Sequence, residues 1–510
     1  MYSKLYSFLL MGIDCHTVTV EVDSMNSMPS FDIVGLPDNA VKEARDRVRY
    51  AIRNSGFTFP MTRLTVNLAP AEMKKSGSMY DLAILLGVLK SSGQIETDTD
   101  KFAFVGQMSL SGEILPVAGI LPMVLYAREQ GFESVFVPFE NSYEGSMIDG
   151  INVYGVKTVK ELILHLNGEE LLTPVEKTSF EAQTLKEEYL DFADVKGQTA
   201  AKYALEVAAA GGHNLLMIGP PGSGKSMLAK RLPSILPNLS FEEAIETTKV
   251  HSISGELNSE KPFVTRRPFR SPHHNVSPAG LAGGGANPRP GEISLAHNGV
   301  LFLDELPEFT RSAMEILRQP LEDRKICIAR VAGNATYPAS VMLVAAMNPC
   351  PCGYKNHPTR ECTCPVGASK RYLSRISGPL LDRIDIHVEM TPVKYDDMTS
   401  TIKAESSADI KQRVERAREM QRNRFKGTNI NCNANIPAAL VAEVCTMTNE
   451  AKELLRKAFD KLSLSARAYD KILKLARTVA DLAGEEMIND KHIGIAIRFR
   501  SLDRKFWGEK

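Results

Sequence analysis

The sequence has 510 residues, enough for about two to four domains that each bury a core of their own. Lysine plus arginine and aspartate plus glutamate both number 61, so the overall charge indicates neither a nucleic acid nor a membrane as partner. The N-terminus lacks a secretory pattern and the longest apolar run, Val341–Met347, is too short to cross a bilayer, which predicts a soluble, cytoplasmic protein.

The first region, residues 1–170, has the pattern of an α+β domain. Apolar residues alternate over Thr17–Val22, which predicts a strand, and an apolar stripe over Val41–Asn54 predicts a helix. A second, mostly apolar helix is expected over Asp81–Leu89. The stretches Phe102–Val105 and Leu110–Leu115, around Ser111 and Gly112, are expected to form strands joined by a turn.

Two stretches of this region, Val66–Asp81 and Gly112–Asn141, resemble the proteolytic domain of Lon-type proteases, which use a serine and a lysine. When the first stretch is aligned on Gly77, Met79 takes the place of the serine, and Leu121 takes the place of the lysine. Neither side chain can act as a nucleophile or a base. The resemblance therefore implies a Lon-like fold without protease chemistry.

Residues 171–192 are charged and poor in apolar anchors, which predicts a linker to a second domain at residues 193–395. This domain contains an apolar run, Leu215–Ile218, followed by a glycine-rich loop and a helical segment, Met227–Leu232. The loop consists of Gly219, Pro220, Pro221, Gly222, Ser223, Gly224, Lys225 and Ser226.

Strand, glycine loop and helix in this order are typical of a phosphate-binding loop. Glycines let backbone N–H groups turn toward phosphate oxygens, and the helix N-terminus adds a positive dipole end. We expect Lys225 to reach the β- and γ-phosphates and Ser226 to ligate Mg²⁺, so ATP and Mg²⁺ are the predicted ligands. A chance glycine-rich turn is the alternative.

Two carboxylates follow a second apolar run, Val300–Leu303. This pattern predicts a buried central strand that delivers acidic side chains at its carboxyl end. We expect Asp304 to hold Mg²⁺ and Glu305 to polarise the attacking water. An ordinary solvated helix start is the alternative, which the upstream loop disfavours.

A third strand, expected over Val341–Met347, ends in Asn348, which matches the residue called sensor 1 in ring ATPases. The preceding segment, Ile326–Val341, resembles the presensor hairpin of helicase-type members.

A later motif, Leu380–Asp385, resembles the one that supplies an arginine finger to the neighbouring subunit. Arg383 is the first choice, with Arg375 and Arg371 as alternatives, because a guanidinium stabilises charge on the transferred phosphoryl group. A surface salt bridge is the other interpretation.

The segment 263–290 inserts a basic stretch between these motifs. It carries His273, His274 and several arginines but no acidic residue, and its three glycines at 283–285 predict a positively charged loop. Such a loop suits contact with DNA phosphates in the channel of a ring, through Arg266, Arg267 and Arg270. A basic surface loop with a structural or nucleotide-sensing role is the alternative.

Four cysteines between residues 350 and 364 follow Asn348 directly and form the pattern C-x-C-x₉-C-x-C. Four thiolates in two close pairs can form a closed, tetrahedral zinc site of structural type. The ligands would be Cys350, Cys352, Cys362 and Cys364, with His357 as a substitute. Reduced free thiols and a redox function are the alternatives.

Helical patterns dominate residues 396–510, including Ser407–Arg424 and Ser465–Leu482, the second preceded by the cap-like residues Ser463 and Ser465. A helical subdomain in this place is similar to the lid of AAA+ proteins, and Arg467 matches its sensor 2 arginine, which reaches the γ-phosphate. A capping or ion-paired arginine is the alternative.

The order of these parts resembles the YifB/ComM family of magnesium-chelatase-like AAA+ ATPases over essentially the whole chain. The implied fold class is α/β: an AAA+ P-loop core with a helical lid, preceded by the Lon-like α+β domain. The implied function is a homo-hexameric ring that hydrolyses ATP, translocates on DNA and promotes branch migration in recombination or natural transformation. A magnesium-chelatase-like motor subunit and a protein-remodelling ATPase are the alternatives, and Met79 and Leu121 disfavour a protease.

Overall fold

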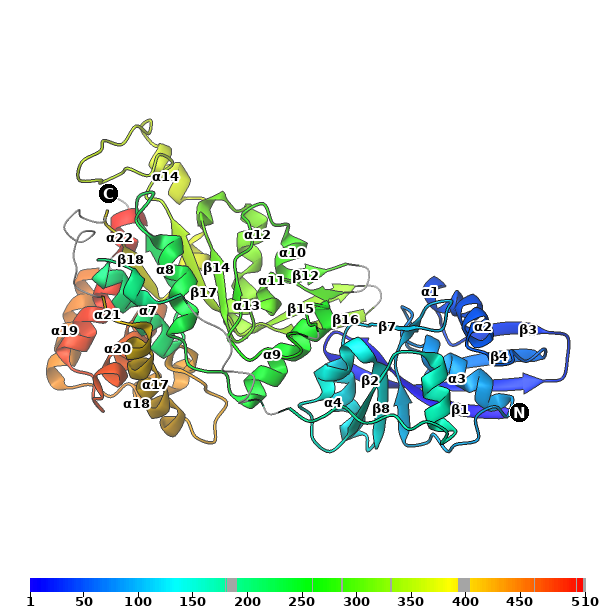
Figure 1. Cartoon of the computed structure of the whole chain (residues 1–510). Coiled ribbons are helices and arrows are strands. Elements are labelled where there is room, and N and C mark those ends of the chain that lie inside the picture. Colours follow the sequence, from blue (N-terminus) through cyan, green and yellow to red (C-terminus); the bar gives the residue numbers. More distant parts are fainter. Residues whose placement is uncertain are drawn as a thin grey trace.

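The computed structural model shows three parts that follow one another along the chain, an N-terminal domain, a central α/β domain and a group of C-terminal helices (Figure 1). It describes residues 1–178, 180, 190–258, 260–285, 288–330, 333–392, 404–462, 464–500 and 502–507. Residues 179 and 181–189 of the predicted linker and the predicted cap residue Ser463 lie outside these ranges. No helix in the ranges is long and apolar enough to span a membrane.

A seven-stranded sheet in the order β3-β4-β2-β1-β5-β8-β9 forms the N-terminal domain. Its strands are β1 (Tyr2–Met11), β2 (Asp14–Met25), β3 (Ser30–Val34), β4 (Arg63–Ala69), β5 (Phe102–Phe104), β8 (Ser134–Pro138) and β9 (Asn152–Val156). The first two strands pair antiparallel from Tyr2↔Asp23 to Met11↔Asp14, and Gly12 permits the tight turn because its φ is +67°. The predicted alternation in β2 is confirmed, since Val18, Val20 and Val22 are buried.

Helices cover this sheet, and one of them is almost entirely buried. The helices are α1 (Asn39–Lys42), α2 (Ala44–Asn54), α3 (Asp81–Ser91), α4 (Ile120–Glu129), α5 (Val159–Leu166) and the 3₁₀ segment η1 (Phe139–Gly145). Helix α3 approaches β2 so closely that a Cβ at Gly87 would lie 2.6 Å from Val22. The predicted turn at Ser111 and Gly112 is confirmed, because the Gly112 N–H donates to the Ser109 carbonyl oxygen at 3.2 Å. The turn joins two short paired strands, β6 (Gln107–Met108) and β7 (Ile114–Leu115).

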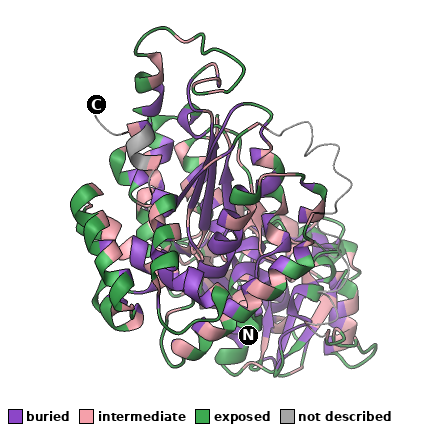
Figure 2. Cartoon of the chain, turned by 90° about the vertical axis from the view of Figure 1, so that its left-hand side faces the viewer, coloured by how far each residue is buried: buried purple, intermediate pink, exposed green. Residues whose placement is uncertain are grey.

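The central domain is built on a parallel five-stranded sheet in the order β11-β14-β17-β10-β18. The strands are β10 (Leu215–Ile218), β11 (Phe269–Arg270), β14 (Val300–Leu303), β17 (Met342–Met347) and β18 (Ile386–Glu389). The helices around it are η2 (Phe192–Asp194), α7 (Thr199–Gly211), α8 (Lys225–Arg231), η3 (Leu232–Ser234), α9 (Phe241–Ser254), η4 (Leu306–Glu308), α12 (Arg311–Ile316), α13 (Arg318–Asp323), α14 (Ala368–Leu373) and α15 (Gly378–Leu381). Every residue of β10, β14 and β17 is buried, as the purple strands of Figure 2 show, which explains their unbroken apolar sequences.

The basic insert is only partly a loop. It contributes β11 to the edge of the central sheet and also forms α10 (Pro278–Ala282), β12 (Gly283–Gly284) and β13 (Arg289–Pro290), followed by α11 (Glu292–Leu295). The predicted hairpin is present as β15 (Lys325–Arg330) and β16 (Gly333–Pro338). It packs on the insert, where the Tyr337 hydroxyl donates to the Pro288 carbonyl oxygen at 2.8 Å.

The C-terminal helices pack on α7 of the central domain. They are α17 (Ser407–Arg424), η5 (Asn433–Asn435), α18 (Ala438–Val444), α19 (Asn449–Leu462), α20 (Ala466–Ala483), α21 (Asp490–Arg500) and α22 (Leu502–Trp507). A buried carboxylate, Asp481, holds three of the elements together, because it accepts hydrogen bonds from Arg424 of α17, Asn433 of η5 and Arg477 of its own helix. The C-terminal part therefore has a polar centre inside its apolar core.

The N-terminal and central domains share one hydrophobic cluster. Phe8 and Val124 of the first domain belong to the same buried set as Leu239 and Ala244 of the second. Helix α4 packs on α9, and the Gly119 N–H donates to the Ser252 carbonyl oxygen at 2.9 Å.

A buried carboxylate, Glu144, crosses this junction. It accepts hydrogen bonds from Ser252 Oγ at 2.5 Å, from Asn141 Nδ2 at 2.9 Å and from the Leu121 N–H at 3.2 Å. Burial raises the pKa of Glu144, and these three donors oppose the shift.

We predict that Ser252→Ala lowers the free energy of unfolding in urea by about 1–3 kcal/mol, because a buried acceptor loses a donor. The folded pKa of Glu144 lies above its unfolded value, so the stability that this group contributes is present at low pH and is lost as the pH rises through the folded pKa. Removal of the Ser252 donor raises that folded pKa further. The loss should therefore be larger at pH 8 than at pH 4.

The matched control is Ser254→Ala, since the Ser254 hydroxyl bonds only within its own helix, to the His251 carbonyl oxygen. Equal losses for both variants, or a loss at Ser252 that does not change with pH, would contradict the assignment.

Candidate nucleotide site

The glycine-rich loop connects β10 to α8 at the carboxyl edge of the central sheet. Gly222 and Gly224 have φ values of +76° and +88°, which other residues rarely adopt. Within the described chain, the backbone N–H groups of these two glycines have no protein acceptor. They are free to donate to phosphate oxygens, as the sequence predicts.

Lys225, the first residue of α8, turns back over the loop. Its ammonium donates to the carbonyl oxygens of Gly219 at 2.8 Å and Pro220 at 2.9 Å, and to Asn348 Oδ1 at 3.1 Å. Burial lowers the pKa of Lys225, and the charges of Asp304 and Glu305 oppose that shift. Lys225 forms no ion pair with any described carboxylate, so its charge remains available to a phosphate.

The strand β14 brings the predicted acidic pair to the same edge. Ser226 Oγ donates to Asp304 Oδ2 at 2.5 Å, so the two predicted Mg²⁺ ligands are already in contact. Hydroxyl and carboxylate oxygens are the ligands that Mg²⁺ prefers, and the ion would neutralise phosphate charge during transfer. Glu305 follows in a left-handed conformation with φ +53°, and its side chain is 55% exposed.

Asn348 follows β17 beside these groups, and its contact with Lys225 joins the end of this strand to the phosphate loop. The structure therefore brings together the loop, Asp304, Glu305 and Asn348, which lie up to 129 positions apart in the sequence. Such a set can bind a nucleoside triphosphate and position a water for attack on its terminal phosphate.

Sequence reasoning missed one member of this site. His274 lies in the basic insert just beyond β11, and its Nδ1 is 3.5 Å from Glu305 Oε2. The ring of His274 lies between His273, with centroids 4.1 Å apart, and the edge of Phe309. The sequence signal for His274 was its position after a strand. Because parallel strands end at the same edge of a sheet, a side chain in this position can lie near Glu305.

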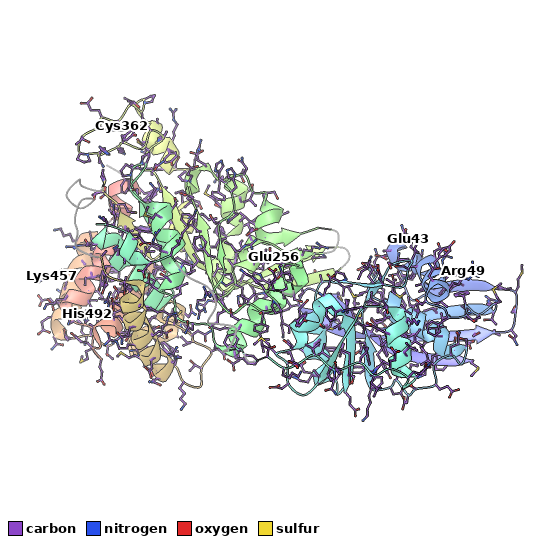
Figure 3. All side chains as sticks on the ribbon, in the orientation of Figure 1. Glu43, Arg49, Glu256, Cys362, Lys457 and His492 are labelled. Atoms are coloured by element: carbon purple, nitrogen blue, oxygen red, sulfur yellow. The ribbon has the colours of Figure 1, made fainter. Side chains whose placement is uncertain are left out.

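Two of the three predicted DNA contacts are engaged elsewhere. Arg267 forms an ion pair with Glu243 at 2.8 Å and donates to three backbone carbonyl oxygens. Arg270 binds Glu292 at 2.7 Å and Glu256 at 3.0 Å, on the side of the central domain that faces the N-terminal domain (Figure 3). These ion pairs favour a structural role for both residues, and their contact with DNA stays a prediction, as does that of Arg266.

The candidate finger and sensor arginines lie away from the loop. Arg383 binds Glu322 and is 17% exposed, whereas Arg375, bound to Glu308, is 53% exposed. Arg371 and Arg467 are exposed. Among the described residues, no arginine forms a hydrogen bond or ion pair with Lys225, Ser226, Asp304, Glu305 or Asn348.

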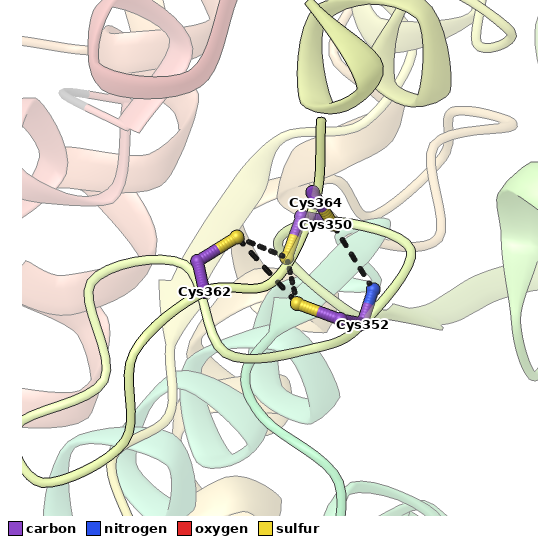
Figure 4. A group of neighbouring side chains, drawn as sticks. All are labelled: Cys350, Cys352, Cys362 and Cys364. Carbon is purple, nitrogen blue, oxygen red and sulfur yellow. Dashed lines mark hydrogen bonds between the residues drawn. The ribbon is translucent and has the colours of Figure 1, made fainter. Parts of the chain in front are cut away.

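The four cysteines gather at one point, as predicted (Figure 4). Cys350 Sγ lies 3.4 Å from Cys352 Sγ and 3.7 Å from Cys362 Sγ, and all four sulfur atoms are within 4.8 Å of one another. Thiolates at about 2.3 Å from a tetrahedral zinc ion are about 3.8 Å apart, so the donor set fits this metal. His357 instead accepts hydrogen bonds from the backbone of Thr359 and Arg360.

The cysteine loop rests on the phosphate loop. Gly353 follows Cys352 with φ +84°, and a Cβ at Gly353 would lie 2.4 Å from Pro221 Cδ. The two loops thus touch without space for a side chain between them.

Comparison with known proteins identifies the family. Residues 20–141 match the family described as subunit ChlI of Mg-chelatase, residues 191–398 match magnesium chelatase, subunit ChlI, and residues 404–500 match its C-terminal family. The competence protein ComM of Haemophilus influenzae is 43% identical over 506 residues, which cover 98% of this chain and 97% of ComM. YifB of Escherichia coli is 41% identical over 504 residues, with 98% and 97% covered.

The chain belongs to the YifB/ComM family of magnesium-chelatase-like AAA+ ATPases. The family implies ATP and Mg²⁺ as ligands of the site described above. The chain is also weakly similar to Lon protease 2 of Bacillus subtilis, 29% identical over 121 residues, or 23% of this chain and 21% of that protein.

The loss of protease residues from the Lon-like domain stays a prediction. Leu121 is buried in α4 at the junction with the AAA+ core, and Met79 packs against the core of the N-terminal domain. Both positions are filled by apolar side chains in a packed environment, which agrees with the absence of a nucleophile and a base there.

We predict that His274→Ala lowers kcat for ATP hydrolysis about tenfold while KM for ATP changes little, because His274 contacts Glu305 and not the phosphate loop. This loss is smaller than the 10²–10⁴-fold contribution of a general base itself. Steady-state hydrolysis measured over a range of ATP concentrations separates the two parameters.

His273→Ala is the matched control, because His273 lies beside His274 with the two rings tilted by 34° and, within the described chain, makes no hydrogen bond or ion pair with Glu305. A rise in KM without a fall in kcat, or equal effects of both variants, would show that His274 does not position Glu305.

Proposed function

We propose that this AAA+ ATPase is a DNA motor that works as a homo-hexameric ring and promotes branch migration. The observation that carries the proposal is an ATP site with one part missing in the single chain. Lys225, Ser226, Asp304, Glu305 and Asn348 converge, yet no arginine of the described chain reaches them. An arginine finger from a neighbouring subunit, Arg383 or its alternatives Arg375 and Arg371, would complete the site.

The C-terminal helices are proposed to act as the lid over the nucleotide, with Arg467 as the sensor at the start of α20. They pack on α7, the helix that leads into β10 and the phosphate loop, so a change in their position would be transmitted to the site. This arrangement supports a coupling between hydrolysis and movement.

The proposed DNA contact lies in the insert and the hairpin β15–β16, which pack together. Arg266 and Arg289 of the insert and Lys325 of the hairpin supply positive charge, and phosphate contacts of this kind bind DNA without reading its sequence. The name of one relative, competence protein ComM, supports a role in natural transformation.

A magnesium-chelatase-like motor subunit is the second candidate, because the three matched families carry the name of that enzyme. This candidate predicts dependence on protein partners and no response to DNA. A protein-remodelling ATPase makes the same prediction for DNA.

We expect forked or single-stranded DNA to raise the rate of ATP hydrolysis by the full-length protein. Glu305→Gln should lower hydrolysis by at least about 10²-fold while ATP binding persists, because the amide cannot polarise the attacking water. Phosphate release measured with and without DNA checks both expectations.

Arg266→Ala should reduce the stimulation by DNA, with Lys457→Ala as control, since Lys457 lies far away on α19 (Figure 3). Absence of both DNA binding and stimulation would reject the DNA motor in favour of the second candidate.

We also propose that Cys350, Cys352, Cys362 and Cys364 hold a structural zinc ion. Four thiolates leave no open coordination position, so the ion would fix the loop and take no part in hydrolysis. Because Gly353 contacts Pro221, the fixed loop would also brace the phosphate loop.

We predict one zinc ion per purified chain, loss of that ion in Cys362→Ser, and a raised KM for ATP in the same variant. Metal analysis and steady-state kinetics measure these changes. The control is Cys327→Ser, because Cys327 is exposed and lies outside the cluster. Purified protein without stoichiometric zinc would remove the claim.

A further inference from the structure

A cavity of about 580 Å³ opens at the edge of the central sheet opposite the phosphate loop. Gly212, Gly299 and Met342 line it, and these residues stand at the amino ends of β10, β14 and β17. The phosphate loop and Asp304 follow the carboxyl ends of the same strands, so the cavity is separate from the nucleotide site.

The walls of the cavity come from two parts of the chain. The central domain supplies Arg267, Arg324 and the acidic start of α9, and the C-terminal part supplies Arg418 and Arg422 of α17 together with the segment that follows this helix. A ligand in the cavity would therefore contact both parts at once.

Arg324 is a cation of this cavity that lacks a side-chain partner within the described chain. It follows α13 with φ +56°, is partly buried, and its guanidinium forms no hydrogen bond or ion pair with any described residue. Burial lowers the pKa of Arg324. A partly desolvated charge without a counter-ion is costly, and an anionic ligand would offset this cost.

Arg418 adds a second positive charge that no carboxylate of the described chain pairs with. Its guanidinium donates to the carbonyl oxygens of Ala209 at 3.0 Å and Asn431 at 3.3 Å, both of which are neutral. Burial, together with the charge of Arg418, lowers the pKa of the nearby Arg267, so the two guanidinium groups are close enough to repel each other. Arg324 and Arg418 thus face the cavity with their charges uncompensated.

The carboxylates of the cavity remove only part of this excess, because three glutamates and five cations line it. Glu243 is paired with Arg267 at 2.8 Å. Glu246 contacts His297 at 3.0 Å, and Glu242 accepts a hydrogen bond from the neutral Ser240 Oγ at 2.9 Å. Arg422 and Lys426 bring further positive charge to the opposite wall.

We propose that this cavity binds a phosphate-bearing ligand, with Arg324 and Arg418 as its main contacts. A guanidinium matches the geometry of a phosphate group and can donate two parallel hydrogen bonds to it. A volume of about 580 Å³ lies within the range of small-molecule sites. The phosphate would come either from a free nucleotide or from a nucleic-acid strand, and in both cases it would join the central domain to α17.

The test uses the full-length Lys225→Ala chain, in which the main phosphate contact of the nucleotide loop is removed, so the outcome does not depend on the ATPase proposal. Inorganic pyrophosphate is the probe, titrated by calorimetry. We expect one saturable site per chain, weakened about tenfold or more by the additional change Arg324→Gln, because one charged contact is lost. Arg53→Gln, on the exposed face of α2, is the matched control.

Arg324→Gln removes no hydrogen bond of the described chain and relieves a partly desolvated charge, so the variant is expected to fold with a Tm that is not lowered. Arg418→Lys keeps the positive charge but loses the forked guanidinium geometry, so it should weaken binding less than Arg418→Gln.

Competition experiments identify the source of the phosphate. Competition by ADP would assign the site to nucleotides, and competition by a short single-stranded oligonucleotide would assign it to nucleic acid. Competition by neither would assign it to inorganic phosphates. No saturable binding, or equal affinity with and without Arg324, would overturn the proposal.

Discussion

The nucleotide site depends on the parallel pairing of three buried strands. Ile218 of β10 pairs with Met347 of β17, and Leu303 of β14 pairs with Ala345 of β17. The three strands therefore end at the same edge of the sheet. The residues that follow are the phosphate loop, Asp304 and Asn348. A shift of one residue in either pairing would turn each strand's side chains to the opposite face and separate these groups. The core thus fixes the chemistry through register.

The charges of the basic insert show why the composition of a segment differs from the charge of a surface. The insert contains no acidic residue, yet Arg267 and Arg270 are paired with carboxylates that other segments supply. The opposite case occurs in the cavity at the amino edge of the sheet, where Arg324 has no carboxylate partner within the described chain. Only the folded arrangement distinguishes a structural arginine from one that is available to a ligand.

Much of the site could be predicted from the sequence, because the phosphate loop, Asp304 and Asn348 each follow a short apolar run that predicts a buried strand. The cysteine cluster was predictable for a different reason, because its four cysteines lie close together in the sequence. His274 and the contact of Gly353 with Pro221 were not, since they depend on which loops meet after the sheet has formed. In the fold, the turn at Ser111 and Gly112 was predictable from its residues, whereas the short lengths of β6 and β7 on either side of it were not.

The buried cluster shared by the N-terminal and central domains has a mechanical consequence. Helix α9 contacts α4 at one end, through Ser252. At the other end, Glu243 holds Arg267 and accepts a hydrogen bond from Asn298. Asn298 stands two residues before β14, the strand that Asp304 follows. A load on the N-terminal domain would therefore reach this strand through α9 and would reach the hairpin through the contact of β1 with β16.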